Sequence, residues 1–311
     1  MDRVRNFHIY DLAFFLSKKS TTFCFNNWTR FTNNQAGQAR YLFDFFGLIS
    51  TDVTAVCLDT ARVYYWGAQI DVDSSLPSAW INWLMAGEKA DNVRLPLLLE
   101  YLIQEAGEAQ KKTLAVILDE GHWFSAAFRQ VGFAVISKQT IWKMHLPDDL
   151  PYPDDWQEVV VQPFNEFDLF YQSQIPPLLR QLGSNWKSPR IYALKKDNQV
   201  VACAKVETDK NNVYIEPIFH PVIENPGKAL IHLAASVSTV PDSELRVAVP
   251  GFQAWMTESM LNEGFQLDTR QIVFVKNLTE KAHDTVPSFL FEQNALQPIR
   301  THQVHTIKKA K

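Results

Sequence analysis

The chain repeats its own pattern at a spacing of 132 residues, and this duplication restricts the fold more than any short motif does. The segment LLLEYLIQEA at 97–106 matches ALIHLAASVS at 229–238, because both place apolar residues at helical spacing. The same spacing aligns three further pairs without a gap: Leu114–Ile117 with Arg246–Val249, Gly132-Phe133 with Gly264-Phe265, and Gln139–Trp142 with Gln271–Phe274. Four matches in one register predict a structural duplication.

Each half predicts the same order of elements: three strands, a helix, a strand, a second helix and a final β-segment. The first half predicts strands at 53–59, 62–70 and 78–84, a helix at 93–107, a strand at 113–118, a helix at 122–130, and strands at 133–136 and 139–144. The second half predicts strands at 190–195, 199–207 and 213–219, a helix at 228–237, a strand at 245–249, a helix near 252–262 and a strand at 270–276. A turn is expected at Asp197-Asn198, and helical sequence precedes the strands at 38–48 and 166–182.

A linker separates the two halves. Leu146 to Trp156 holds three Pro and four Asp, which continue neither a helix nor a strand. We therefore expect domains at 1–148 and 155–278, followed by a tail at 279–311. The tail has no acidic residue from Gln293 onward, and its few basic residues favour a solvated or docked extension over a nucleic-acid arm.

Composition narrows the classes of function. A length of 311 residues suits two domains, and 46% hydrophobic residues exclude a chain that is disordered throughout. The net charge of -4 is spread evenly, since residues 1–150 carry 14 basic and 16 acidic side chains, so we expect no nucleic-acid or membrane partner. No apolar run reaches the roughly 18 residues of a membrane span, which favours a cytoplasmic protein of undetermined oligomeric state.

The three cysteines point to neither a disulfide framework nor a zinc site. Cys24, Cys57 and Cys203 lie far apart and form no Cys-x-x-Cys pair. Cys57 and Cys203 lie in apolar, strand-like runs, so we expect both to pack in the core.

The helix, strand and helix–strand segments of the repeat are LLEYLIQEA, LAVIL and AAFRQVGFAVISKQTIWKM in the first half, and GKALIHLAA, LRVAV and MLNEGFQLDTRQIVFVK in the second. These segments and the order of elements resemble the GNAT family of acyl-CoA N-acyltransferases. The arrangement also looks like tandem GNAT proteins and covers roughly 3–146 and 157–278. The resemblance implies an α/β chain of two tandem GNAT-like domains, each a mixed twisted sheet flanked by helices. It also implies acetyl-CoA as co-substrate, bound by one domain only or by neither.

GNAT proteins hold the CoA pyrophosphate on backbone N–H groups at the start of the central helix, in a Q/R-x-x-G-x-G/A loop. The first half has no Gly at 90–95, and only Arg94 is suited to a phosphate. Asp91 or Asn92 could equally be an ordinary N-cap there. The second half matches in part through Asn225, Gly227 and Lys228, which are the expected cofactor-binding residues together with Arg94, although simple helix capping explains them too.

Acyl transfer to an amine needs a base for the amine proton and often an acid for the leaving thiolate. The acid of the family is a Tyr four residues before the Gly-Phe pair, where this chain has Phe128 and Met260. The expected bases are Glu216 and His220 in the second half, whereas the first half offers Asn82 and His122.

Strand alternation places Tyr214, Glu216 and Ile218 on one face and Val213, Ile215 and Pro217 on the other. Glu216 should therefore face either a cleft or solvent, and the sequence leaves both readings open. His122 could likewise be an ordinary residue on the surface of its helix and not a base facing the cleft.

Other chemistries lack their motifs. The sequence has no GxSxG, Walker, HExxH or GxGxxG pattern, and Pro221 breaks the helix that would bring His220 and Glu224 together on a metal. We expect an acetyl-CoA-dependent N-acyltransferase acting on a small amine or a peptide amine. The alternative is a GNAT-like pair without catalysis that senses a ligand or binds a protein.

Overall fold

The computed structural model describes residues 3–15, 20–32, 52–73, 75–147, 156–160, 166–182, 190–238, 240 and 242–278. The predicted helical segment at 38–48 and the predicted tail at 279–311 lie outside these residues.

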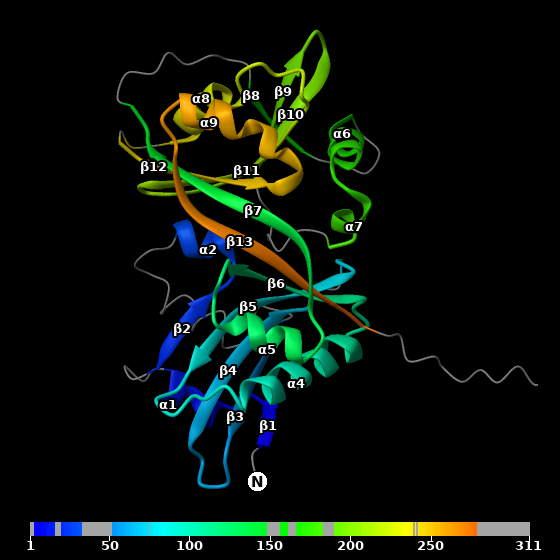
Figure 1. Cartoon of the computed structure of the whole chain (residues 1–311), viewed down its shortest axis with the longest axis vertical. Coiled ribbons are helices and arrows are strands. Elements are labelled where there is room, and N and C mark those ends of the chain that lie inside the picture. The colour runs from blue at the N-terminus through cyan, green and yellow to red at the C-terminus, as the bar shows by residue number, and fades with distance from the viewer. Residues whose placement is uncertain are drawn as a thin grey trace, which may run out of the picture. The chain divides into compact units, whose positions relative to one another are not determined.

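The elements of the first half follow the predicted order (Figure 1). Its strands are β1 (Arg3–Asn6), β2 (Thr21–Cys24), β3 (Val53–Leu58), β4 (Tyr64–Asp71), β5 (Ser78–Ala86), β6 (Thr113–Asp119) and β7 (Ala134–His145). Its helices are η1 (Ile9–Asp11), α1 (Leu12–Phe15), α2 (Asn27–Thr32), α4 (Leu95–Glu108) and α5 (Phe124–Gln130). The two short strands predicted at 133–136 and 139–144 are one continuous strand, β7.

The second half repeats this order. Its strands are β8 (Trp156–Val159), β9 (Arg190–Lys196), β10 (Gln199–Asp209), β11 (Asn212–Phe219), β12 (Glu244–Pro250) and β13 (Gln266–Asn277). Its helices are α6 (Glu166–Gln174), α7 (Pro177–Arg180), α8 (Pro226–Val237), η2 (Gly251–Met256) and α9 (Thr257–Asn262). Trp156, assigned to the linker from sequence, instead begins β8, where its indole N–H donates to the Ala229 carbonyl at 3.0 Å.

The central helices carry the duplication most clearly. Leu98, Leu99 and Leu102 of α4 are fully buried against the first sheet, and their counterparts 132 residues later on α8 are buried as well. Strands β6 and β12 depart from this spacing by one residue, because Leu114 and Leu245 occupy the equivalent core positions. The predicted alignment of Leu114 with Arg246 is therefore wrong by one residue: Leu114 lies 12 positions after Leu102, whereas Leu245 lies 11 positions after the equivalent Ala234.

The Gly-Phe pairs end the second helix of each half in the same way. Gly132 and Gly264 both have φ of +86°, a left-handed conformation that glycine adopts without strain. Phe133 N–H then donates to the Phe128 carbonyl, and Phe265 N–H to the Met260 carbonyl, each at 3.0 Å. This helix ending turns both Phe rings into the core, which explains why the pair recurs.

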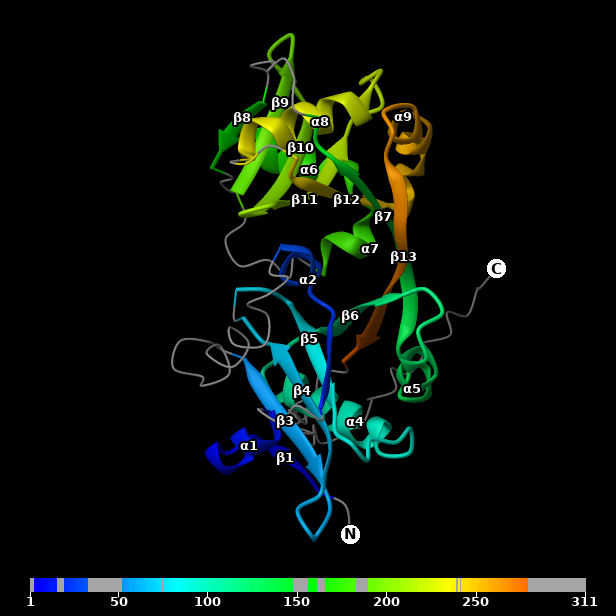
Figure 2. The same cartoon turned by 90° about the vertical axis from the view of Figure 1, so that its left-hand side faces the viewer.

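The last strand of each half pairs with the sheet of the other half. Strand β13 lies between β6 and β7, while β7 pairs in turn with β12. Figures 1 and 2 both show β7 and β13 side by side between the strands of the two halves. Phe274 of β13 accordingly packs in the first core and Trp142 of β7 in the second.

As a result, the described strands form one sheet in the order β1-β3-β4-β5-β6-β13-β7-β12-β11-β10-β9-β8, with β2 paired to β5. All described residues belong to one compact unit, Met1–Glu280. The domain boundaries expected at residues 148 and 155 therefore stay a prediction from the sequence repeat.

The cysteines, all of which the structure describes, form no disulfide, and Cys57 and Cys203 are buried. No helix in the described part of the chain is long and apolar enough to cross a membrane.

The helix ending at Gly264 gives a stability prediction with a matched control. Gly264→Ala should lower the free energy of unfolding by about 1 kcal/mol, because only the backbone is strained: a Cβ there meets nothing within 4 Å. Gly107→Ala also meets nothing within 4 Å, but it lies within α4 at an ordinary φ and should stabilise the protein by about 0.5–1 kcal/mol. Urea unfolding of both variants measures the difference, and equal effects would contradict this reading of Gly264.

Candidate functional site

Parallel strands β11 and β12 separate at their carboxyl ends. They pair over Asn212–Ile215 and Glu244–Val247, and the pairing stops there although both strands continue and are described throughout. Ligands of open α/β sheets bind at the carboxyl ends of parallel strands, so we expect a binding site beside this opening.

Two cavities lie on the face of β10 and β11 that points away from α8. Their volumes are about 140 and 200 Å³, and both are lined by Tyr171, Lys205 and Glu216. The smaller cavity reaches Trp80 of the first half, and the larger one reaches Phe167 of α6. Residues from both halves therefore build one site.

Glu216, the predicted base, lines both cavities. Tyr214 donates its hydroxyl proton to Glu216 Oε1 at 3.2 Å, so the two side chains share a face as the alternation predicts. Val213 and Ile215 point to the opposite face and pack in the core beneath α8. Burial, together with the neighbouring Glu216 carboxylate, raises the pKa of Tyr214 well above its ordinary value, so this phenol remains a neutral donor.

Lys205 is the cross-strand neighbour of Glu216. Its ammonium donates to the Tyr171 hydroxyl at 3.0 Å. Burial acts to lower the pKa of Lys205, but Tyr171 and Glu216 outweigh it, so the pKa is raised and the group stays charged. Lys205 was not among the predicted site residues, although it is the single Lys within the apolar run VVACAKVE.

Cys203 lies on the wall of the larger cavity, near these two residues. Burial raises the pKa of its thiol to about 12, so the thiol is protonated at neutral pH and is a poor nucleophile.

Side chains of the protein already bond the start of α8. Asn225 Oδ1 accepts from Lys228 N–H at 3.0 Å, and Gly227 N–H donates to Ser259 Oγ at 2.9 Å. Glu263 accepts from Asn225 Nδ2 at 2.6 Å, which places a carboxylate beside the helix start. A Cβ at Gly227 would lie 2.8 Å from the Ser259 carbonyl oxygen, so this glycine permits close packing of α8 on α9. Of the predicted binding residues here, Lys228 alone presents an exposed charge.

The start of α4 is filled by its own acidic residue. Asp91 accepts from Arg94 N–H at 2.9 Å and also pairs with the Arg94 guanidinium, which lies 4.0 Å from the Tyr65 ring centroid. Asp91 therefore caps the turn that leads into α4, whereas the N-cap of the helix itself is Arg94, so the prediction of Asp91 or Asn92 as N-cap is wrong. The Asp91 carboxylate opposes a phosphate there.

Other parts of the chain bond the strands that diverge at the two openings. In the first half, β2 pairs with Trp83–Ala86 of β5, beyond the point where β5 leaves β6. In the second half, the buried Gln253 side chain bonds both the N–H and the carbonyl of Phe219, at 3.2 and 2.9 Å. Neither feature was predicted from the sequence, because neither follows from local spacing.

The remaining predicted residues lie away from the cavities. His220 is exposed after β11, and its Nδ1 accepts from Val222 N–H at 3.2 Å. Phe128 and Met260 are fully buried, so the positions of the expected acid hold apolar core residues. His122 stacks on Phe124 with centroids 4.5 Å apart. Within the described residues, no group of three His, Cys, Asp or Glu side chains could hold a metal ion.

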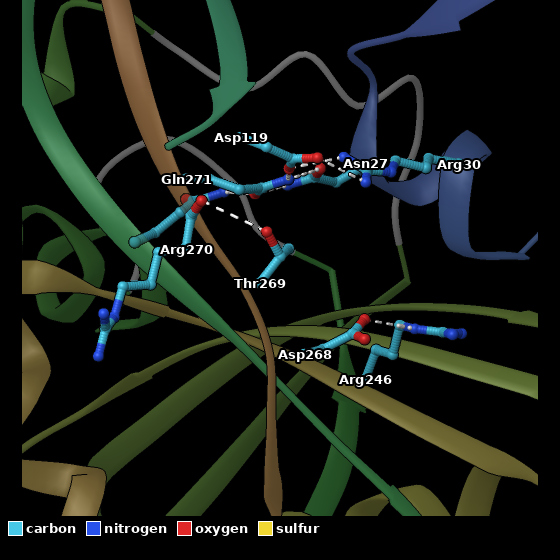
Figure 3. Close-up of polar contacts among 9 residues, drawn as sticks. Asn27, Arg30, Asp119, Arg246, Asp268, Thr269, Arg270 and Gln271 are labelled. Atoms are coloured by element: carbon cyan, nitrogen blue, oxygen red, sulfur yellow. Dashed lines mark hydrogen bonds and ion pairs between the residues drawn. The ribbon is translucent and has the colours of Figure 1, made fainter. Parts of the chain in front are cut away.

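A polar network connects α2 to the exchanged strands near this site (Figure 3). Asn27 and Gln271 form a reciprocal amide pair, with both hydrogen bonds at 2.8 Å. Arg30 makes two 2.8 Å hydrogen bonds to the Asp119 carboxylate. Burial acts to raise the pKa of Asp119. The hydrogen bonds from Arg30 and Gln271 and the charge of Arg30 outweigh this effect, so the pKa of Asp119 is lowered.

The network holds α2 against the second half. Phe31 of α2 packs there in a small cluster with Ile141, Tyr214 and Ala248. Because Tyr214 in turn bonds Glu216, the network helps to position the candidate base.

Comparison with known proteins identifies the architecture. A putative acetyltransferase from Pyrococcus horikoshii aligns with a TM-score of 0.50 and 11% identity, over 85% of this chain and 91% of the other. The chain has the GNAT fold. Its order of strands and helices in each half makes it a tandem GNAT-fold protein.

Two further structures align at lower scores. A GCN5-related N-acetyltransferase from Sphaerobacter thermophilus has a TM-score of 0.48 and 11% identity, over 85% of this chain and 97% of the other. A tandem GNAT protein from the clavulanic acid biosynthesis pathway has a TM-score of 0.47 and 13% identity, over 74% and 83%. No family model and no curated protein matches the sequence.

The ion pair between Arg30 and Asp119 predicts a pH-dependent stability. Asp119→Asn should lower the free energy of unfolding at pH 7 by about 1 kcal/mol, since both groups are partly exposed and solvent screens the pair. Because the folded-state pKa of Asp119 lies below the ordinary value of 3.8, its contribution is present above about pH 4 and is lost at lower pH.

Urea titrations of wild type and Asp119→Asn across this pH range test the prediction, with the exposed Glu258→Gln as control. A difference that stays constant down to about pH 2 would exclude the ion pair as its cause.

Proposed function

We propose that this tandem GNAT-fold protein is an acetyl-CoA-dependent N-acyltransferase whose second half accepts a small amine or a peptide amine. The observation that supports this most directly is Glu216, a carboxylate lining two cavities beside the opening between β11 and β12. Acetyl-CoA would supply the acyl group as a thioester. Glu216 would take the proton from the amine, directly or through a water, as the amine attacks.

Binding of acetyl-CoA would rely on charge more than on a backbone cradle. The first half does not fit a pyrophosphate, because Asp91 occupies the start of α4. The second half fits in part: Lys228 is exposed there, although Asn225 and Ser259 already bond the first N–H groups of α8. Turnover should be slow, since Met260 gives the leaving thiolate no proton and water must do so.

The N–H groups at the starts of α4 and α8 already bond side chains of the protein, and this favours a second candidate function. A pair of GNAT-like halves without catalysis, serving as a ligand-sensing or protein-interaction module, needs no pyrophosphate site. The two candidates differ in whether acetyl-CoA binds.

Calorimetric titration of the full chain with acetyl-CoA separates these functions. Lys228→Glu should weaken binding about fivefold or more, because it reverses a charge beside the phosphates, whereas Glu263→Gln should strengthen it about fivefold. The exposed Lys196→Glu at the end of β9 is the control and should leave the Kd unchanged. These variants isolate charge better than Gly227→Asp, which would also disturb the packing of α8 on α9. Absence of acetyl-CoA binding to wild type would leave the non-catalytic module.

Acetyl transfer to a panel of amines tests the role of Glu216. Glu216→Gln should lower kcat about 100-fold, because the amide accepts no proton, with little change in the Kd of acetyl-CoA. Glu258→Gln, on the exposed side of α9, should behave as wild type. Unchanged turnover in Glu216→Gln would remove this residue from the mechanism, and bound acetyl-CoA without turnover in wild type would favour the non-catalytic module.

A further inference from the structure

Transfer of an acyl group from a thioester leaves a thiolate, and neither half offers it the expected acid. Phe128 and Met260 hold the two positions where a Tyr is expected, and both are fully buried apolar residues. A positioned acid that protonates a leaving group speeds such a step by about 10²–10⁴. An acid for the second half would therefore have to come from another element and reach the opening between β11 and β12.

The smaller cavity extends along that opening and contains a phenol. It is lined by Ile218 of β11 and by Ala248 and Pro250 of β12, which lie beyond the paired part of the two strands. Tyr171 of α6 lines the same cavity, and it lines the larger one as well. Among the described residues of the cavity walls, Tyr171 is the one phenol. The smaller cavity thus connects this phenol with the place where the thioester would lie.

The Tyr171 hydroxyl is held by Lys205 and keeps its own proton for another acceptor. Lys205 Nζ donates to the hydroxyl oxygen at 3.0 Å and lies 5.0 Å from the Tyr171 ring centroid. Because the ammonium uses a lone pair of the oxygen, the O–H proton is not spent on this contact. In the described structure the hydroxyl makes no hydrogen bond besides the one from Lys205.

Lys205 also prepares Tyr171 for the loss of that proton. The pKa of Lys205 is raised, because Tyr171 and Glu216 outweigh burial, so the ammonium stays charged while it bonds the phenol. When the O–H proton leaves, the oxygen gains a negative charge. The hydrogen bond from Lys205 then becomes a contact between opposite charges and stabilises the phenolate.

The other proton donors of the cavity walls are less suitable as acids. Lys205 holds its own proton, as its raised pKa indicates. Burial raises the pKa of the Cys203 thiol to about 12, and Cys203 lines the larger cavity but not the smaller one. The Ser137 hydroxyl donates to the Lys138 carbonyl at 3.3 Å, and an aliphatic hydroxyl is a weaker acid than a phenol.

We propose that Tyr171 is the proton donor of the second half and passes its hydroxyl proton, through a water molecule in the smaller cavity, to the thiolate of CoA. This inference rests on the proposed function, since it supplies the acid of that reaction. A cavity of about 140 Å³ has room for the water, which takes about 30 Å³ of liquid volume.

The protons of the proposed step balance within the site. The amine nitrogen bonds to the carbonyl carbon, the carbon–sulfur bond breaks, and Glu216 takes the proton that the amine loses. The sulfur takes a proton from the water, and Tyr171 replaces it. Transfer of the proton from Glu216 to the Tyr171 phenolate then restores both groups, because both line the same cavity.

Two acetyl donors with different leaving thiols test this role on the full chain. S-Acetyl-N-acetylcysteamine releases an alkyl thiolate like that of CoA, whereas S-(4-nitrophenyl) thioacetate releases a stabilised aryl thiolate that leaves without a proton. Tyr171→Phe keeps the ring beside Lys205 and removes the hydroxyl. With acetyl-CoA and with the alkyl donor it should lower kcat at least about tenfold, and with the aryl donor it should change kcat less than about twofold. The Kd of acetyl-CoA should stay as in wild type.

Tyr192→Phe is the matched control. Tyr192 is 8% exposed on β9, its hydroxyl donates to Glu158 at 3.2 Å, and it lines neither cavity. Loss of this hydroxyl should leave kcat unchanged with all three donors.

The outcomes separate this inference from the proposed function. Equal losses in Tyr171→Phe with the alkyl and aryl donors would overturn the proposal, because a hydroxyl that only shapes the cavity affects both donors alike. Unchanged kcat in Tyr171→Phe with acetyl-CoA would also overturn it and would keep the acyltransferase function. Absence of transfer by wild type from all three donors would remove the acyltransferase function and the role of Tyr171 together.

Discussion

The antiparallel pairing of β7 with β13 joins the two halves, and the rest of the structure is arranged about it. Its register places Gln139 opposite Gln271, and the Gln139 amide donates to Gln271 Oε1 at 2.8 Å. These residues are equivalent positions of the 132-residue repeat. A position that pairs with its own equivalent lies on a twofold axis, so the two halves are related as the subunits of a symmetric dimer are. Fusion into one chain makes this exchange of strands permanent.

Helix contacts follow the same symmetry. Phe31, next to the end of α2, packs on the second half with Ile141, and Leu182, just after α7, packs on the first half with Ile117 and Val273. Each half is therefore covered by a helical segment that comes before the strands of the other. Because the two halves are parts of one chain, each can carry different residues at equivalent positions. Glu216 of β11 lies where β5 of the first half has Asn82. In addition, β2 pairs with β5 beside the opening of the first half. The cavities lie on the side of the second half, with Trp80 contributed by the first.

Local pattern predicted most elements of the fold, and it failed where the structure depends on distant pairing. The apolar spacing of α4 and α8 and the Gly-Phe endings are local properties, so the sequence revealed the repeat. Strand exchange leaves no such trace, because β13 presents the same alternating side chains whichever sheet it joins. Alternation predicted which face of β11 carries Glu216 but left open whether that face meets a cleft or solvent. Its neighbours Lys205 and Tyr171 come together only when α6 packs on β10.

The two places where a GNAT-fold chain could meet a charged ligand differ in how well the protein satisfies its own polar groups. At the start of α8, Asn225 and Ser259 bond the free N–H groups, which stabilises the helix without any ligand. In the cavity, by contrast, Lys205 keeps its charge although burial disfavours it, because Tyr171 and Glu216 outweigh the burial. The capping of α8 depends on the helix and its neighbour α9, whereas the charge of Lys205 depends on α6 packing on β10. A change in the packing of α6 would therefore alter the electrostatics of the cavity and leave the start of α8 as it is.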